Sequence, residues 1–362
     1  MQHREAALLW SHLNVLTKER YDALIRVYGS LDDAAKHLGE EMLRGLGCRQ
    51  DTVINAMLRL EEFDAASYQR ELEKRHLQFL EWTDERYPSR LREIGDPPPF
   101  LYARGDLSIL GQPCLGLVGT RNMSGYGKRV AETFVPPVVA AGVVTVSGLA
   151  EGIDAAVAEE TLRAGGRTVA VLGHGLHMIF PKSNERLADE ITKGGGLLLT
   201  EFPLRAETGK YTFPARNRII AGLSLGTVVL EAPEGSGAII TAELALEYGR
   251  DVFVVPGQIF DPNYAGSHAL LAKGTAMLVT SPTEVLREIG VVAPAEGKTL
   301  SSFVPSTPEE KTVFAALTTM PQEIDALVGK TKMDAGRLNA VLTMMELSGG
   351  AKNIGGGLWV RT

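Results

Sequence analysis

The sequence predicts an α/β protein whose core is a parallel sheet covered by helices on both faces. A small helical domain is expected before this core and a winged-helix-like domain after it. Between residues 114 and 279, seven short apolar runs rich in β-branched residues alternate with helical stretches. Buried strands that alternate with helices in this way pair in parallel. Helical patterns precede these runs, and three helical patterns with a terminal glycine-rich hairpin follow them.

The composition is that of an ordinary globular protein. The 362 residues are 44% hydrophobic and 22% charged, which suggests two or three domains with sizeable cores. No apolar stretch approaches the ~20 residues that cross a bilayer, and the N-terminus has no continuous apolar segment of the secretory kind. Cys48 and Cys114 lie far apart without a metal-ligand spacing, so two reduced thiols are expected. We therefore expect a cytoplasmic protein with no membrane segment.

Residues 1–80 predict a small helical domain of the SAM or helix-hairpin-helix type. A glycine-containing turn at 43–47 joins two helical patterns, and such turns let backbone amides approach a phosphate. Plain packing of the turn is the alternative, and the sequence leaves both open. The leucines of the first helical pattern fall at helical spacing, at Leu8, Leu9, Leu13 and Leu16.

Residues 81–289 predict the core domain. Three consecutive prolines, Pro97–Pro99, indicate a stiff extended segment that cannot be helical. Pro136 and Pro137 fall inside the first predicted core helix and should kink it or end it early. The seven predicted strands are Cys114–Val118, Val143–Ser147, Thr168–Leu172, Leu197–Glu201, Gly226–Glu231, Asp251–Val255 and Ala276–Val279.

The C-terminal part predicts a linker and a separate small domain. Prolines and small polar residues make 290–307 the linker, and 308–362 then predicts a winged helix. The charge of this last region is balanced, whereas a winged helix that reads DNA carries a basic recognition helix, so a protein-contact or structural role is favoured. The expected helices are Glu309–Leu317, Gln322–Val328 and Asp334–Ser348, followed by a hairpin at Gly349–Gly357.

The loops that follow the strands form the candidate site, because parallel sheets bind ligands at the carboxyl ends of their strands. The loop after the first strand opens a helix with glycines and carries Arg121, whose planar guanidinium suits phosphate. It is not a dinucleotide fingerprint, since 119–124 reads GTRNMS. Glycine turns at helix starts also follow the second and fifth strands. The candidate residues of these loops are Gly119, Thr120, Arg121, Ser124, Gly125, Gly127, Ser147, Gly148, Gly235, Ser236 and Gly237.

Cations and aromatic residues gather after the third and fourth strands. The segment 210–218 mixes two aromatic residues with three cations. Bases stack on aromatic rings at ~1–3 kcal/mol each, and cations hold the backbone. Alternatively, Phe213 is core and the charges are surface residues, and the segment alone does not decide. Together these loops predict a long phosphate-lined rim, which suits a strand better than one nucleotide. The candidates here are Lys182, Lys210, Phe213, Arg216, Asn217 and Arg218.

Charge and motifs restrict the function further. The formal net charge of −7 counts against a globally basic nucleic-acid binder, so any basic surface must be local. The chain lacks the nucleophile-elbow, zincin, Walker A and zinc-cluster patterns. His174 and His177 flank a glycine turn with no nucleophile beside them, which favours buried or solvated histidines. We expect no catalytic residue, no metal and no cofactor.

Taken together, the loops resemble the DprA (Smf) family of DNA-processing proteins over about residues 95–285. The sequence departs from the family at His177, Phe180 and 266–268, where aspartate, tyrosine and a Gly-x-Asn are common. These departures concern the pocket. The matching segments are Leu117–Arg121, Ser124–Gly127, Ser147–Ala150, Gly152–Asp154, Ala170–Gly173, Gly175, Pro181, Asn184, Leu187, Glu201–Pro203, Phe213–Pro214, Arg216–Ser224, Glu231–Ala232, Ser236–Gly237, Thr241–Ala242, Gly249–Arg250, Val255–Gly257 and Gly266.

The resemblance implies an extended Rossmann-like domain that binds single-stranded DNA, usually as a homodimer, without being an enzyme. It also implies RecA as a partner, which the family loads onto incoming single strands in natural transformation. Displacement of single-strand-binding protein and protection of the incoming DNA belong to the same activity. By motif position, DNA contact falls to Arg121, Lys210, Phe213 and the glycine loops. The dimer surface falls at about 250–275.

Two other functions remain as alternatives. A nucleotide phosphoribohydrolase of the lysine-decarboxylase-like group carries a P-G-G-x-G-T-x-x-E signature. Residues 233–237 match this signature only in part. Glu243 lies six residues after Gly237 rather than four, so its carboxyl would be misplaced by about half a helical turn. A nucleotide sensor that uses the same loops is the other alternative.

Overall fold

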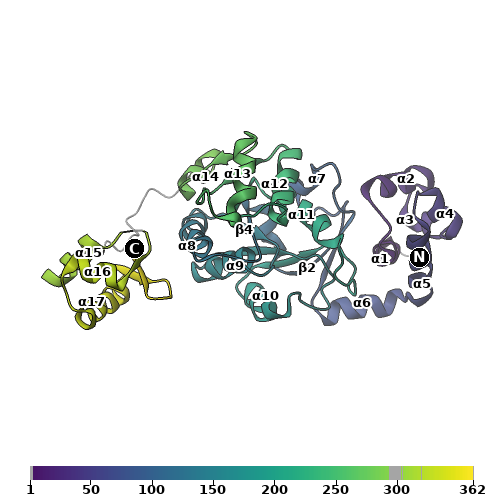
Figure 1. Cartoon of the computed structure of the whole chain (residues 1–362). Helices are drawn as coiled ribbons and strands as arrows, with labels where there is room; N and C mark the ends of the chain where they lie inside the picture. The colour runs from purple at the N-terminus through teal and green to yellow at the C-terminus, as the bar shows by residue number, and fades with distance from the viewer. Residues whose placement is uncertain (1–2, 293–302, 304, 319, 362) are drawn as a thin grey trace. The chain divides into compact units, whose positions relative to one another are not determined.

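The computed structural model describes residues 3–292, 303, 305–318 and 320–361. The chain divides into two compact units, Met1–Ala293 and Pro294–Thr362. Figure 1 shows the elements of both in chain order. Most of the predicted linker, namely residues 293–302 and 304, lies outside the described residues.

The first unit begins with six helices. Three of the leucines that show helical spacing, Leu8, Leu9 and Leu13, lie on α1 and are buried, whereas Leu16 follows the helix. The indole N–H of the buried Trp10 donates to the carbonyl of Leu31 over 3.1 Å, which joins α1 to the start of α3. The helices are α1 (His3–Leu13), α2 (Lys18–Tyr28), α3 (Leu31–Ala35), α4 (Glu40–Gly45), α5 (Gln50–Glu62) and α6 (Ala65–Lys74).

The glycine turn at 43–47 connects α4 to α5, and its amides are engaged within the turn. The N–H groups of Leu46, Gly47 and Cys48 donate to carbonyls of α4. The guanidinium of Arg20 donates to the carbonyls of Leu46 and Gly47 over 3.0 Å. Because these groups already have partners, the geometry favours the packing alternative for this turn over phosphate binding.

A nine-stranded sheet forms the core of the first unit, in the order β1-β2-β6-β5-β4-β3-β7-β8-β9. The seven predicted strands all exist and pair in parallel. Two antiparallel strands at one edge, β1 and β2, were not predicted. The strands are β1 (Gln78–Glu81), β2 (Phe100–Gly105), β3 (Cys114–Gly119), β4 (Val144–Ser147), β5 (Thr168–Val171), β6 (Leu197–Thr200), β7 (Gly226–Glu231), β8 (Asp251–Val254) and β9 (Met277–Leu278).

Helices cover both faces of the sheet, and strand residues alternate between them. On β3, Leu115 and Leu117 pack in a cluster with α8, α9 and α14, whereas Cys114 and Val118 pack with α11, α12 and α13. Figure 1 shows α11 and α12 on one side of the strands and α8, α9 and α10 on the other. The helices are α7 (Ser89–Arg92), α8 (Gly125–Ala140), α9 (Ile153–Arg163), α10 (Glu185–Lys193), α11 (Thr212–Leu223), α12 (Gly237–Glu247), α13 (Ala265–Ala272) and α14 (Pro282–Glu288), with 3-10 turns η1 (Leu107–Gly111), η2 (Lys182–Asn184) and η3 (Pro262–Tyr264).

Helix α8 decides one of the two outcomes expected for its prolines, the early end. Pro136 and Pro137 lie inside it, yet the helix continues to Ala140 instead of ending early. Val135 and Val138 on either side of the prolines are buried in the core. Packing of this apolar face stabilises the last turn even though two backbone donors are missing, since tertiary burial outweighs local propensity.

The second unit is a three-helix domain with a small sheet of order β10-β12-β11, as the winged-helix prediction requires. The helix predicted from Gln322 begins instead with the two-residue strand β10, which pairs with β12. Its core includes the buried side chains of Val313, Leu327, Leu342 and Trp359. The elements are α15 (Pro308–Ala316), β10 (Gln322–Glu323), α16 (Ile324–Thr331), α17 (Ala335–Leu347), β11 (Ala351–Asn353) and β12 (Leu358–Arg361).

Candidate functional site

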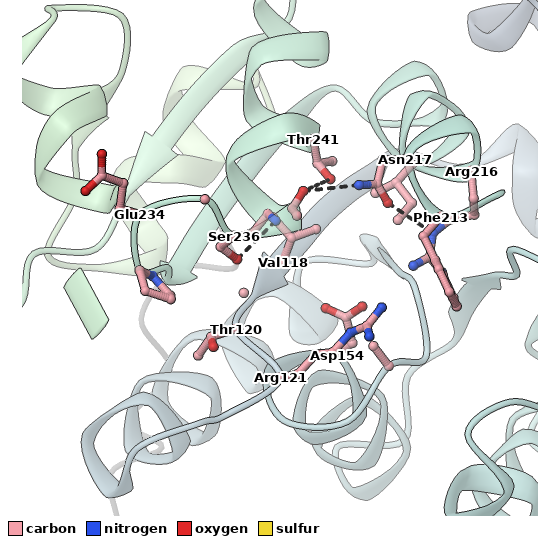
Figure 2. Close-up of a pocket in the computed structure, with 17 residues that line it drawn as sticks. Val118, Thr120, Arg121, Asp154, Phe213, Arg216, Asn217, Glu234, Ser236 and Thr241 are labelled. Atoms are coloured by element: carbon pink, nitrogen blue, oxygen red, sulfur yellow. Dashed lines mark hydrogen bonds between the residues drawn. The ribbon is translucent and has the colours of Figure 1, made fainter. Parts of the chain in front are cut away.

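A cavity of about 320 Å³ opens where the strand order of the parallel sheet reverses. Strand β3 lies between β4 and β7 in the sheet. At the carboxyl ends of β3 and β7, the loops that follow these two strands diverge. Such a switch point is where doubly wound sheets bind ligands. The pairing of β3 with β7 shifts in register between Val118 and Gly119, at the start of the first glycine loop. Loops 119–121 and 233–237 form two of the cavity walls, as Figure 2 shows.

The mouth of the cavity carries a stacked cation and ring. The Arg121 guanidinium lies 4.9 Å from the centre of the Phe213 ring. Arg121 belongs to the loop after β3, and Phe213 to the first turn of α11, so the fold joins two segments that the sequence separates by about ninety residues. In the described part of the chain, the exposed Arg121 has no carboxylate in salt-bridge range. Its charge is therefore available to an anionic ligand.

The floor of the cavity holds a buried cation. The Arg216 guanidinium donates to the carbonyls of Gly148 and Val171 and, over 3.1 Å, to the side-chain oxygen of Asn217. Burial lowers the pKa of Arg216 to about 10, and the nearby Asp154 carboxyl opposes this shift. Arg216 is therefore still protonated at neutral pH. Burial conversely raises the pKa of Asp154, against the effect of the Arg216 charge.

Glycine at 148 is needed for this buried cation. A β-carbon there would lie 2.4–2.5 Å from three guanidinium atoms of Arg216. The Gly148 N–H donates to the Asp154 carboxylate over 3.0 Å and is not free for a phosphate. Gly148 was predicted to donate its N–H to DNA, and the Asp154 carboxylate competes for that N–H. Its closeness to Arg216 explains the glycine by packing alone.

The first turn of α12 forms the wall opposite Arg121. Ser236 caps this helix, since its hydroxyl accepts the Ala238 N–H over 3.3 Å. The Asn217 amide donates to the Gly237 carbonyl over 3.1 Å and ties α11 to this turn. A helix N-terminus presents partial positive charge and unpaired amides. The wall therefore suits an anion, as the Gly235-Ser236-Gly237 pattern predicts.

The N-terminus of α8 differs, because a carboxylate of the chain already occupies it. Glu231, the buried last residue of β7, accepts the Ser124 N–H over 3.1 and 3.2 Å and the Ser124 hydroxyl over 3.0 Å. The Asn263 amide donates to it over 2.8 Å. A β-carbon at Gly127 would lie 1.7 Å from a Glu231 oxygen. The sequence did not indicate that Glu231 would occupy the loop of the predicted Ser124, Gly125 and Gly127. Glu231 does, however, belong to one of the segments that match the family.

The other predicted residues are dispersed. Lys182 and Lys210 are exposed and line no part of this cavity. The Arg218 guanidinium pairs with Glu201 and, over 3.2 Å, with Asp96. Ser147 is buried at the end of β4. The cavity itself brings together Gly119, Thr120, Arg121, Phe213, Arg216, Asn217, Gly235, Ser236 and Gly237.

Two exposed aromatic residues near the site were not among the predicted contact residues, although Tyr211 belongs to the predicted segment 210–218. Phe180 is 43% exposed, and Tyr211 is 87% exposed. The ring centre of Phe180 lies 6.1 Å from that of Phe213. Their sequence context offered a weak signal, because each stands beside a residue that was predicted, Tyr211 next to Lys210 and Phe180 two residues before Lys182.

His174 is a buried structural histidine. Its Nε2 accepts the Phe180 N–H over 3.2 Å, so its Nδ1 carries the proton and donates to the Gly175 carbonyl over 3.0 Å. Burial lowers the pKa of His174, which keeps the imidazole neutral. Cys48 and Cys114 are both free and buried, as expected.

Further features restrict the chemistry in the described residues. No cluster of three or more histidine, cysteine or acidic side chains has the arrangement of a metal site there. None of the helices in that part is long and apolar enough to span a bilayer. A phosphoribohydrolase would need Glu243 in the cavity, but this exposed residue does not line the cavity. Its Oε1 lies 3.9 Å from Nζ of Lys273.

The chain matches known proteins over both units. Residues 78–290 match the family model of DNA recombination-mediator protein A, and residues 300–357 match the DprA winged helix domain. The DNA processing protein DprA of Streptococcus pneumoniae is 41% identical over 258 residues, which are 70% of this chain and 89% of that protein.

Two solved structures are similar as well. The X-ray structure of DNA processing protein A from Streptococcus pneumoniae has a TM-score of 0.65 at 37% identity and covers 78% of this chain and 97% of that one. A Helicobacter pylori structure, described as showing the single-stranded DNA binding mode of its DNA processing protein A, has a TM-score of 0.53 at 29% identity, with 59% and 96% covered. The chain therefore belongs to the DprA family of DNA recombination-mediator proteins.

Proposed function

We propose that this protein binds single-stranded DNA along the cavity at the switch point and acts there as a recombination mediator rather than an enzyme. The observation that carries the proposal is the Arg121–Phe213 pair at the cavity mouth. It places a phosphate-binding cation against a ring on which a base can stack. The Helicobacter pylori relative, whose structure concerns single-stranded DNA binding, supports the choice of ligand.

The cavity supplies attraction for a backbone in a chain whose net charge is −7. Arg121 provides a charge at the surface, and the N-terminus of α12 provides a partial positive charge. The buried Arg216 adds a fixed positive charge in a poorly solvated place, where it acts over a longer distance than in water. Local attraction of this kind offsets the overall repulsion between an acidic protein and DNA.

Family membership extends the proposal to partners. We infer that the protein acts as a homodimer that loads RecA onto single strands, displaces single-strand-binding protein and protects the incoming DNA in natural transformation. The support for this part is the recombination-mediator family itself. Lys182 and Lys210 are proposed to contact the strand outside the cavity. Arg218, which was also predicted to contact DNA, is already paired with Glu201 and Asp96 and is given no such contact.

The experiment is a fluorescence anisotropy titration of labelled oligothymidine. Arg121→Ala should weaken binding several-fold and reduce the dependence of affinity on salt, because one phosphate contact is lost. Lys210→Ala should weaken it in the same way. Arg287→Ala removes an equal charge from an exposed position of α14 and serves as the control. If Arg121→Ala and Lys210→Ala both bind like the wild type, the site assignment is wrong.

A second titration addresses the nucleotide sensor, which the volume of the cavity makes worth testing, since small-molecule pockets begin at about 300 Å³. We expect a nucleoside monophosphate to compete with oligothymidine only weakly, because it offers one phosphate and one base. Tight binding of the mononucleotide without binding of the oligonucleotide would favour the sensor instead. Release of free base during the incubation would favour the phosphoribohydrolase.

A further inference from the structure

The loop that carries Arg121 is held at both of its ends by one residue, Glu231. At the start of the loop, the Thr120 N–H donates to the main-chain carbonyl of Glu231 over 2.7 Å. At its end, the Ser124 N–H donates to the Glu231 carboxylate over 3.1 and 3.2 Å, and the Ser124 hydroxyl over 3.0 Å. Arg121 follows the first anchored residue directly. The loop therefore has little freedom to move away from Glu231.

Helix α8, which begins at the end of this loop, does not need Glu231 as its cap. The Ser124 hydroxyl accepts the Gly127 N–H over 3.0 Å and caps the helix itself. The Glu231 side chain is fully buried, and burying a carboxylate costs several kcal/mol of hydration unless hydrogen bonds replace the water. A second polar group at an end that is already capped is explained by the loop that it holds.

A third segment of the chain meets the same carboxylate. The side-chain amide of Asn263, in η3, donates to Oε1 of Glu231 over 2.8 Å. Burial raises the pKa of Glu231, and the hydrogen bonds from Ser124 and Asn263 oppose this shift. A protonated carboxyl would direct its hydrogen at one of these donors, so the geometry requires the carboxylate.

Glu231 also lies where the two walls of the cavity part. It is the last residue of β7, and the opposite wall, 233–237, begins two residues later. Figure 2 shows Thr120 and Arg121 on one side of the cavity and Ser236 on the other. Glu231 is joined to the first wall by hydrogen bonds and to the second by the chain itself. It therefore sets the spacing between Arg121 and the N-terminus of α12.

We propose that Glu231 is a positioning residue for single-strand binding, which holds Arg121 at the distance from α12 that a phosphate of the strand requires. This inference rests on the proposed function. Glu231 makes no contact with DNA itself, because its side chain is buried and both of its oxygens already accept from the chain. Binding groups need such support to stay in a productive geometry. Since Glu231 acts through Arg121, loss of its hydrogen bonds can cost no more affinity than loss of Arg121.

The test reverses one hydrogen bond. Glu231→Gln directs an amide N–H at Asn263 or Ser124, which both donate to it in the wild type. Asn263→Asp directs a second carboxylate at Glu231. In anisotropy titrations of labelled oligothymidine, each single variant should bind several-fold more weakly, but not more weakly than Arg121→Ala. The double variant again pairs an amide with a carboxylate, in the opposite sense, and should recover most of the wild-type affinity.

A double-mutant cycle separates positioning from a general loss of structure. Glu231→Gln should cause no further loss in the Arg121→Ala background. It should cause its full loss in the Lys210→Ala background, because Lys210 lies in another loop. Hydrogen exchange without DNA gives an independent measurement. The amides of 119–127 should exchange faster in Glu231→Gln, whereas those of β5, Thr168–Val171, should exchange as in the wild type.

The outcomes distinguish this role from the proposed function. Unchanged binding by Glu231→Gln, or an equal loss with and without Arg121, would overturn the positioning role and leave the proposed function intact. Faster exchange in β5 as well would also overturn it, because Glu231 would then act on the whole fold. A double variant as weak as the single ones would do the same. Failure of the wild type to bind oligothymidine would instead refute the proposed function, and this inference with it.

Discussion

The buried Arg216 offers a quantitative test of how the site is built. Arg216→Met keeps the length of the side chain but removes three hydrogen bonds, to Gly148, Val171 and Asn217. Each charge-assisted bond contributes about 1.5–3 kcal/mol, but the change also relieves the cost of burying the cation. Removing one member of a buried charge network costs about 3–5 kcal/mol on balance. We expect the free energy of unfolding to fall by that amount.

The assay is urea denaturation at pH 7, followed by far-ultraviolet circular dichroism. Arg287→Met, at an exposed position of α14, should change the unfolding free energy by less than about 0.5 kcal/mol. Arg121→Met should also leave stability nearly unchanged, because its guanidinium is exposed. A loss below about 1 kcal/mol for Arg216→Met would refute the conclusion that this side chain organises the cavity floor.

Two further predictions concern stability. Burial lowers the pKa of His174 below its value of about 6.5 in the unfolded chain, so its stabilising contribution is present above that pH and is lost as the pH falls through the lower folded-state pKa. The unfolding free energy should therefore fall less between pH 7.5 and 5.5 in His174→Gln than in the wild type, and equal slopes would exclude this role. Pro137→Ala should raise the unfolding free energy by about 2 kcal/mol, because it restores a helical donor in α8. Thermal denaturation checks this value, and a lower melting temperature would contradict it.

The parallel part of the fold could be predicted because most of its strands are buried on both faces. Gly226–Glu231 was predicted with the bounds that the structure shows, since every residue of this run is buried. The antiparallel strands β1 and β2 were missed although most of their residues are buried. Gln78–Glu81 is only four residues long, and the apolar run that begins β2 directly follows three prolines, which indicate extended chain but not a strand of the sheet.

The candidate site was predicted less completely. The loops after the strands pointed to the correct edge of the sheet, because the carboxyl ends of parallel strands lie together. The glycines in those loops, however, have different reasons to be there. Gly148 makes room for Arg216, and Gly127 makes room for Glu231. A sequence shows that a side chain is missing but not which neighbour needs the space.

By itself, the sequence determined the fold class, the family and the order of the seven parallel strands along the chain, because these depend on local periodicity and on motifs that lie close together. Only the tertiary structure decided which of the similar arginines does what. Arg121, Arg216 and Arg218 are all basic residues of candidate loops, yet one is exposed on a ring, one is buried under the cavity and one is paired with acids. The role of a charged side chain depends on its burial and on its ion-pair or hydrogen-bond partners. Both are set by residues that lie far apart in the chain.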